Sequence, residues 1–166
     1  FHADPNPANY AFRPEGRIVL YDYGCVKKLE DEQRRVYAEI LRASMNQNYE
    51  RVDEMMWELG GRAEGTELDP DFYKKLHHIM FEPVMERELY DYGEGLVQRR
   101  VEDNTDLFVR HEEAFQPPPG GVYVDRTIVG IHNILRQLKA EVPCGRILDQ
   151  YMEYADQRSA EIDRQD

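Results

Sequence analysis

The chain opens with the stretch FHADPNPANYAFRPEGRIVLYDYG, residues 1–24 of 166. Two short apolar and aromatic runs lie within it, Tyr10–Phe12 and Ile18–Tyr21, and Pro14 and Gly16 stand between them. Paired apolar runs around a turn that contains Pro and Gly predict a β-hairpin. The hairpin would bring the residues before its first strand close to the residues after its second strand.

Three polar residues, Asp4, Asn9 and Asp22, lie at the two ends of this hairpin. Phosphoryl transfer from ATP requires Mg²⁺ to be held against the phosphates, and hard cations take oxygen ligands from carboxylates and amides. Asn9 and Asp22 have that chemistry, and pairing of the strands would let them share a metal ion. A carboxylate is also needed beside the phosphoryl acceptor to orient it and take its proton, and Asp4 is suited to this. Each residue alone is ordinary turn chemistry, so the prediction rests on their joint spacing.

The spacing of these residues resembles the catalytic and metal-binding loops of the protein-kinase-like superfamily. The order is His, one residue, Asp, four residues, Asn, then a hairpin and Asp-aromatic-Gly. The wording HADPNPAN, residues 2–9, followed by RPEGRIVL, residues 13–20, resembles the UbiB/AarF family of atypical kinases, whose loop commonly reads H-A-D-P-H-P-G-N. The likeness is strongest over residues 1–29 and continues more weakly to about residue 148.

The resemblance implies a role for each residue of the motif. Asp4 would be the catalytic-loop carboxylate, Asn9 a magnesium ligand and Asp22 the principal magnesium ligand, with Mg²⁺ and ATP as cofactors. His2 would support the catalytic loop, and Gly24 would be the flexible end of the metal turn.

The sequence departs from the usual family pattern at three positions, which are Asn6 in place of His, Ala8 in place of Gly and Tyr23 in place of Phe. The first two could alter the geometry of the loop. The third keeps an aromatic ring beside the metal turn.

From residue 30 onward the apolar residues follow a helical period. Their spacing predicts two helices, the second ending at Gly60-Gly61. Asp69-Pro70 predicts the start of a third helix. We expect it to end near Glu82, because Pro83 disfavours helix in the residue before it.

A further, irregular helical pattern runs from Gly93 to Phe115. The sequence QPPPGG at residues 116–121 predicts a connector that cannot continue a helix. Two more helices are predicted after it, one marked by Ile128 to Leu138 and one beginning with Ile147 and Tyr151.

The predicted fold class is therefore mainly α. We expect a kinase-like C-lobe with one small β-hairpin carrying the catalytic and metal loops, followed by about five or six helices. Residues 1–166 would form a single domain. Its predicted parts are the catalytic loop, hairpin and metal turn (1–29), a helical region (30–115), the Pro/Gly connector (116–121) and C-terminal helices (122–166).

Composition excludes some functions. The net charge is −12, from 21 Lys and Arg against 33 Asp and Glu, which argues against nucleic acid as a partner because phosphate backbones need clustered cations. The two cysteines, Cys25 and Cys144, lack the paired spacing of a zinc or redox motif, which favours a reducing, cytoplasmic setting. His77 and His78 are adjacent on a predicted helix, so they would point in different directions and are interpreted as structural.

The leading hypothesis is the C-lobe of an ATP-dependent atypical kinase or ATPase. The resemblance links such proteins to isoprenoid-quinone (ubiquinone) biosynthesis and implies an unknown small-molecule or lipid-associated substrate. The resemblance also implies peripheral membrane association, although the sequence itself does not indicate it. The family's N-lobe features, a nucleotide loop, a strand lysine and a K-x-G-Q segment, would lie before residue 1, so we expect the 166 residues alone to be inactive.

Two alternatives stay open. One is a small-molecule phosphotransferase of the aminoglycoside or choline kinase type, although Ala3 and Pro5 favour UbiB/AarF because the aminoglycoside enzymes usually have Gly before the Asp. The other is a non-catalytic pseudokinase or helical interaction module. Retention of all three polar residues counts against the second alternative.

Overall fold

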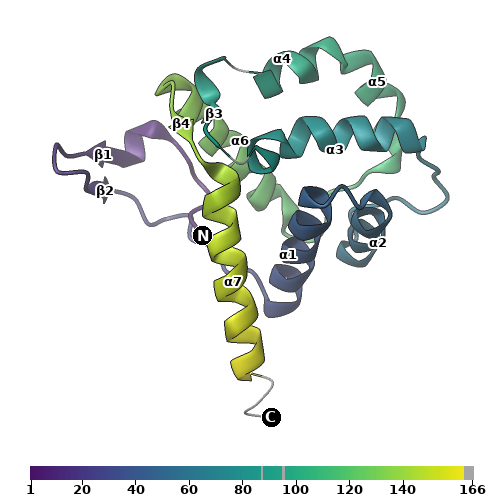
Figure 1. Cartoon of the computed structure of the whole chain (residues 1–166), viewed down its shortest axis with the longest axis horizontal. Helices are drawn as coiled ribbons and strands as arrows, with labels where there is room; N and C mark the ends of the chain where they lie inside the picture. The colour runs from purple at the N-terminus through teal and green to yellow at the C-terminus, as the bar shows by residue number, and fades with distance from the viewer. Residues whose placement is uncertain (87, 95, 163–166) are drawn as a thin grey trace.

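Helices form most of the structure (Figure 1). It is a computed structural model that describes residues 1–86, 88–94 and 96–162. The α-helices among these residues are α1 (Asp31–Met45), α2 (Tyr49–Leu59), α3 (Pro70–Met85), α4 (Leu96–Asp103), α5 (Thr105–Arg110), α6 (Gly121–Gln137) and α7 (Cys144–Ile162). The strands and 3₁₀ turns are β1 (Tyr10–Phe12), β2 (Ile18–Leu20), β3 (Tyr90–Asp91), β4 (Glu141–Val142), η1 (Pro7–Asn9), η2 (Tyr92–Glu94) and η3 (Glu112–Ala114). The predicted mainly α fold is confirmed, with seven α-helices in the described part of the chain instead of five or six.

The predicted hairpin is present. Strands β1 and β2 pair antiparallel with Tyr10 opposite Leu20 and Phe12 opposite Ile18. Gly16 has φ +78° in the turn, a left-handed conformation that glycine adopts without steric cost. Figure 1 shows the hairpin projecting away from the helices.

Helices α1 and α2 pack together and supply most of the core. Their ends follow local signals, because the Asn48 side chain caps α2 and Gly60 ends it with φ +79°. Both helices were predicted by their apolar spacing. The buried residues that form the core cluster are Val36, Ile40, Ala43, Val52, Met55, Leu59 and Tyr73.

Helix α3 begins as predicted and ends later than predicted. Asp69 caps its N-terminus with its side chain, and Pro70 is its first residue. The predicted end near Glu82 is wrong, since the helix continues through Pro83 to Met85. The Pro83 side chain is less than 2% exposed, so burial of its apolar ring offsets the backbone hydrogen bond that proline cannot make.

The region after α3 is more divided than the sequence suggested. Two short helices, α4 and α5, replace the single irregular helix predicted over Gly93–Phe115, and Asn104 separates them. Strands β3 and β4 form a second antiparallel ladder, with Tyr90 opposite Val142, which no pattern predicted. The connector ends one residue early, because Gly121 already begins α6.

The last predicted segment, 122–166, is helical as far as it is described. It contains α6 and α7 with β4 between them, and its residues 163–166 lie outside the described part of the chain. Helix α7 starts against the end of α3, since a side-chain carbon on Gly145 would lie 2.8 Å from the carbonyl oxygens of Val84 and Glu86. The long α6 is the element that reaches the N-terminal loop.

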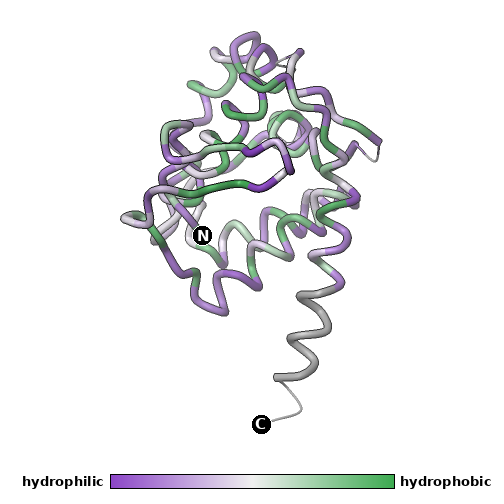
Figure 2. Tube along the Cα trace, turned by 90° about the vertical axis from the view of Figure 1, so that its left-hand side faces the viewer, coloured by the Kyte–Doolittle hydropathy of each residue, from purple (hydrophilic) through white to green (hydrophobic). Residues whose placement is uncertain are grey.

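The helices are amphipathic. Figure 2 shows hydrophobic and hydrophilic residues alternating along their traces. In the described part of the chain, no helix is long and apolar enough to cross a membrane.

Candidate functional site

The start of the chain is fixed by pairing with the segment after the hairpin. The Ala3 amide donates to the Cys25 carbonyl at 2.8 Å, and His2 forms an isolated antiparallel bridge with Val26. Ala3 is completely buried. The loop that begins at His2 is therefore anchored to the residues just beyond the Asp22 turn.

Asn9 and Asp22 are brought together by the same hairpin. The Tyr21 amide donates to the Asn9 carbonyl at 2.9 Å. Because Asp22 follows Tyr21 in the chain, the backbone of Asp22 lies close to that of Asn9. This confirms the expected closeness of the two ends of the hairpin. Asn6, one of the departures from the family pattern, accepts from the Ala8 amide through its side chain at 3.0 Å and so caps the turn η1 that leads to Asn9.

The carboxylate of Asp4 is held at both oxygens. The Asn9 side-chain amide donates to Asp4 Oδ2 at 2.9 Å, and Arg126 donates to Asp4 Oδ1 at 2.5 Å. Asp4 remains 27% exposed at its side chain, so it can still be reached from solvent. Arg126 was not predicted as a partner of Asp4, because it lies on α6, 122 positions further along the chain.

The hydrogen bond to Asp4 also orients the Asn9 amide. Asn9 uses its Nδ2 to donate to the carboxylate and the backbone carbonyl of Asp4. Its Oδ1 accepts no hydrogen bond from any group in the described part of the chain. The oxygen is thus not used by another described group, and Asn9 lies between Asp4 and the segment that leads to Asp22.

Asp22 is exposed and has one oxygen engaged. Its Oδ1 accepts a hydrogen bond from the Gly24 amide at 2.7 Å, which closes the turn. Gly24 is not in the left-handed region, and an added side-chain carbon there would lie 3.1 Å from Asp22 Oδ1. Glycine at this position therefore allows close approach of the Asp22 carboxylate, and its predicted flexibility stays a prediction.

The contacts of His2 are packing contacts. Both of its ring nitrogens are buried without a hydrogen-bond partner, and the ring lies edge-on to Tyr10 at 6.4 Å between centroids. The predicted supporting role of His2 stays a prediction.

A second Asp-Tyr-Gly turn occurs at residues 91–93. The Gly93 amide donates to Asp91 Oδ1 at 2.7 Å, the same geometry as at Asp22. The neighbouring Tyr92 is 6% exposed, whereas Tyr23 in the first turn is 70% exposed. The turn by itself is therefore no evidence of a metal site, and the case for Asp22 rests on its position beside Asn9.

Helix α6 supports the loop through two further contacts. Lys27 lies over the ring of Tyr123 at 4.3 Å from its centroid. Gly130 faces Pro5 so closely that a side-chain carbon on Gly130 would lie 2.0 Å from Pro5 Cγ. The buried Pro5 thus occupies space that only glycine leaves free.

Gly130→Ala is expected to destabilise the chain by about 1–3 kcal/mol because the new methyl group overlaps Pro5. At an open helical position the same change would stabilise by about 0.5–1 kcal/mol. Urea unfolding followed by circular dichroism measures the difference. The double variant Gly130→Ala with Pro5→Ala is the control and should recover much of the loss, whereas a single variant that is more stable than the parent would contradict the contact.

The other histidines and cysteines do not form a metal centre. His77 is buried among aromatic rings, and burial lowers its pKa to about 4, while His78 is exposed. The prediction that they point in different directions is confirmed. Cys25 and Cys144 are both free. Within the described residues, no group of three His, Cys, Asp or Glu side chains could hold a metal ion.

Comparison with known proteins gives matches over most of the chain. Residues 1–56 match the ABC1 atypical kinase-like domain. A probable protein kinase UbiB of Pasteurella multocida is 30% identical over 143 residues, covering 83% of this chain and 26% of that protein. A probable protein kinase UbiB of Aeromonas hydrophila subsp. hydrophila is 27% identical over 157 residues, covering 92% of this chain and 28% of that protein. An uncharacterized protein of Synechocystis sp. is 33% identical over 79 residues, covering 46% of this chain and 19% of that protein.

The chain thus spans about a quarter of the length of the UbiB relatives that it matches. The matched part includes the loop and hairpin that hold Asp4, Asn9 and Asp22.

Proposed function

This chain belongs to the UbiB/ABC1 family of atypical kinases, and we propose that its residues 1–24 form the magnesium side of an ATP site. Asn9 and Asp22 would hold Mg²⁺ against the phosphates. Asp4 would orient the phosphoryl acceptor and take its proton. The activity would be that of an ATP-dependent phosphotransferase or ATPase.

The observation that carries the proposal is the hydrogen bond from Asn9 Nδ2 to Asp4 Oδ2 at 2.9 Å. It fixes the carboxylate beside the amide and leaves the amide oxygen of Asn9 for a cation. The Asp22 carboxylate accepts from the Gly24 amide through Oδ1, and this hydrogen bond does not use Oδ2. Mg²⁺ is commonly bound by one or two protein ligands together with phosphate oxygens and water, so a pair such as Asn9 and Asp22 fits the ion without a third acidic residue.

The ion pair with Arg126 bears on what Asp4 would do. Arg126 holds Asp4 Oδ1 in a charge-assisted hydrogen bond and so fixes the position of the carboxylate. Asp4 would therefore act by orienting the acceptor hydroxyl, stabilising its developing positive charge and taking its proton as the bond forms.

The charge of the nucleotide sets a further requirement. Kinase-like sites neutralise the phosphates with metal ions and with cations from the opposite side. Near the hairpin, Arg17 is already paired with Glu15 at 2.5 Å, and Lys27 lies over Tyr123. We propose that the opposing cations come from a region corresponding to the remaining length of the UbiB relatives.

The family resemblance adds isoprenoid-quinone biosynthesis as the setting of this activity, with a small-molecule or lipid-associated acceptor. This part of the proposal rests on the family alone. The location in the cytoplasm likewise stays a prediction.

A chimaera tests the proposed function. In it, this chain replaces the matching 143-residue stretch of the Pasteurella multocida relative. Calorimetry with Mg-ATP is expected to show binding to the chimaera at least about 100-fold tighter than binding to the 166 residues alone, because the net charge of −12 repels the nucleotide and the opposing cations are missing.

EDTA serves as the control for metal dependence and should abolish binding to the chimaera. Micromolar binding to the 166 residues alone would contradict the need for an opposing region. Absence of magnesium-dependent binding in the folded chimaera would reject the proposed ATP site.

A further inference from the structure

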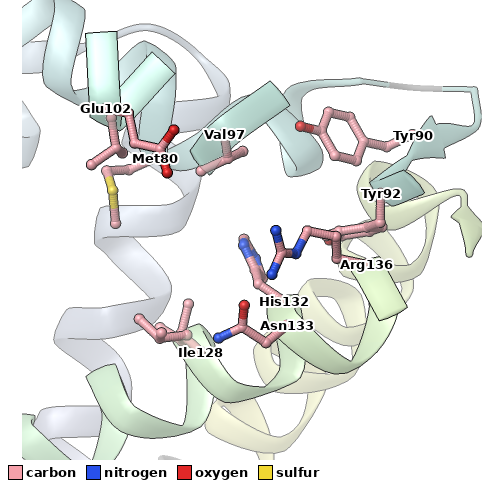
Figure 3. Close-up of a pocket in the computed structure, with 11 residues that line it drawn as sticks. Met80, Tyr90, Tyr92, Val97, Glu102, Ile128, His132, Asn133 and Arg136 are labelled. Atoms are coloured by element: carbon pink, nitrogen blue, oxygen red, sulfur yellow. The ribbon is translucent and has the colours of Figure 1, made fainter. Parts of the chain in front are cut away.

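A cavity of about 500 Å³ lies beside α6, away from the residues proposed for the ATP site. Its walls come from α3, the β3–η2 segment, α4 and α6 (Figure 3). The apolar part of its lining consists of Met80, Val97, Val101, Ile128 and Val129. This volume lies within the range of about 300–1,000 Å³ that small-molecule sites in proteins occupy. We call it the α6 cavity.

One wall of the α6 cavity carries a buried polar group without a partner. Tyr90 is 5% exposed, and its hydroxyl proton has no acceptor in the described part of the chain, although the Val97 backbone amide lies near the oxygen and slightly opposes the rise of its pKa. Burial raises the pKa of Tyr90 to about 12, so the hydroxyl keeps its proton and can donate. An unsatisfied buried hydroxyl costs about 1–3 kcal/mol, and an oxygen atom of a bound molecule would remove that cost.

The lining of the cavity also includes a cation, which lies near Tyr92 in Figure 3. Arg136 is exposed on the last turn of α6 and forms no ion pair with any described residue. Figure 3 shows its guanidinium directed toward His132. Burial lowers the pKa of His132, so the imidazole is neutral near pH 7 and adds hydrogen-bonding capacity without repelling Arg136.

The surface next to Arg136 carries charges of both signs. A smaller adjoining hollow shares Glu102 and Arg136 with the α6 cavity and adds Arg99 and Lys139 as cations and Glu94 as a second acid. The carboxylate of Asp91 also lies beside Gly93 and Lys139, so three cations here balance three acids, whereas the whole chain has a net charge of −12. The guanidinium of Arg136 beside an apolar cavity is complementary to an anionic group on an apolar molecule.

We propose that the α6 cavity binds a small apolar molecule that carries one carboxylate or phosphate group. The apolar body would lie between α4 and α6, and the anionic group would contact Arg136. This inference does not depend on the proposed ATP site, because neither Asp4, Asn9 nor Asp22 lines the cavity.

Three unbranched probes with ten carbon atoms each test the proposal: decanoate, decyl phosphate and decanol. Calorimetry on the 166-residue chain, below the concentrations at which the probes aggregate, measures each affinity. At least one anionic probe is expected to bind about tenfold more tightly than decanol, since a direct contact with an arginine is worth about 1–2 kcal/mol. The tighter of the two anionic probes identifies carboxylate or phosphate as the preferred group.

Variants locate the binding. Arg136→Gln should weaken the anionic probe about tenfold and leave decanol unchanged. Arg110→Gln is the matched control, because Arg110 is also exposed, carries the same charge and lies outside the cavity lining. Val101→Trp should fill the cavity and remove binding of all the probes, with circular dichroism confirming that the variant is folded.

Three results would overturn the proposal. They are equal affinities for the charged and uncharged probes, equal losses in the Arg136→Gln and Arg110→Gln variants, and undiminished binding in a folded Val101→Trp variant. Because Arg136→Gln changes an exposed side chain, the test stands even if the tryptophan variant does not fold.

Discussion

Asp22→Asn is expected to lower the affinity of the chimaera for Mg-ATP by at least about 100-fold, equivalent to about 3 kcal/mol. The carboxylate of Asp22 is the only charged group among the two proposed metal ligands. Asparagine keeps the oxygen that accepts from the Gly24 amide, so the turn should persist while the negative charge is lost. Calorimetry with Mg-ATP measures the effect.

The second Asp-Tyr-Gly turn supplies a matched control. Asp91→Asn removes the same charge from a turn of the same hydrogen-bond geometry, at a position outside the proposed site. It should leave Mg-ATP affinity unchanged. Asn9→Ala should weaken binding by a smaller factor than Asp22→Asn, because it removes a neutral ligand.

Unchanged affinity in Asp22→Asn would remove Asp22 from the metal site. Equal losses in Asp22→Asn and Asp91→Asn would mean that long-range charge, and not ligation, governs binding. Only a loss confined to Asp22 supports the assignment of this residue as the principal ligand.

The sequence predicted those parts of the fold that local chemistry determines. The hairpin follows from apolar runs around Gly16, the end of α2 follows from Gly60, and the start of α3 follows from Asp69. In each case the residue that sets the conformation lies within a few positions of the element that it ends or begins. Asn9 and Asp22 were placed together for the same reason, because one hairpin joins them.

Features that depend on distant contacts could not be predicted. Pro83 stays inside α3 because its ring is buried, and burial is a property of the assembled fold. Strands β3 and β4 are two residues each, too short to produce a pattern, and they pair across about fifty positions. Arg126 on Asp4 belongs to the same class, since nothing near Arg126 in the sequence marks it as a partner of the loop.

Asp4→Asn is expected to lower kcat of the chimaera by about 10²–10⁴-fold, the usual range for loss of a general base. The affinity for Mg-ATP should change by no more than about threefold, because Asp4 is not a proposed metal ligand. Phosphate release at saturating Mg-ATP gives kcat, and calorimetry gives the affinity. An amide in place of the carboxylate keeps one acceptor oxygen, so it can accept from Arg126 or from Asn9 but not from both. Circular dichroism checks that the variant is folded.

The contacts of Asp4 decide how such a result is interpreted. Because Asp4 is bonded to Asn9 and to Arg126, a loss of activity in Asp4→Asn has two physical sources, the missing base and the missing ion pair. Arg126→Gln separates them: it removes the ion pair while keeping the Asp4 carboxylate, and it should therefore reduce kcat far less than Asp4→Asn does. A fall in kcat and affinity by the same factor in Asp4→Asn would instead show that Asp4 acts on the metal or on the fold. A chimaera that binds Mg-ATP but shows no turnover with Asp4 intact would contradict the proposed enzymatic role of the loop and favour the non-catalytic alternative.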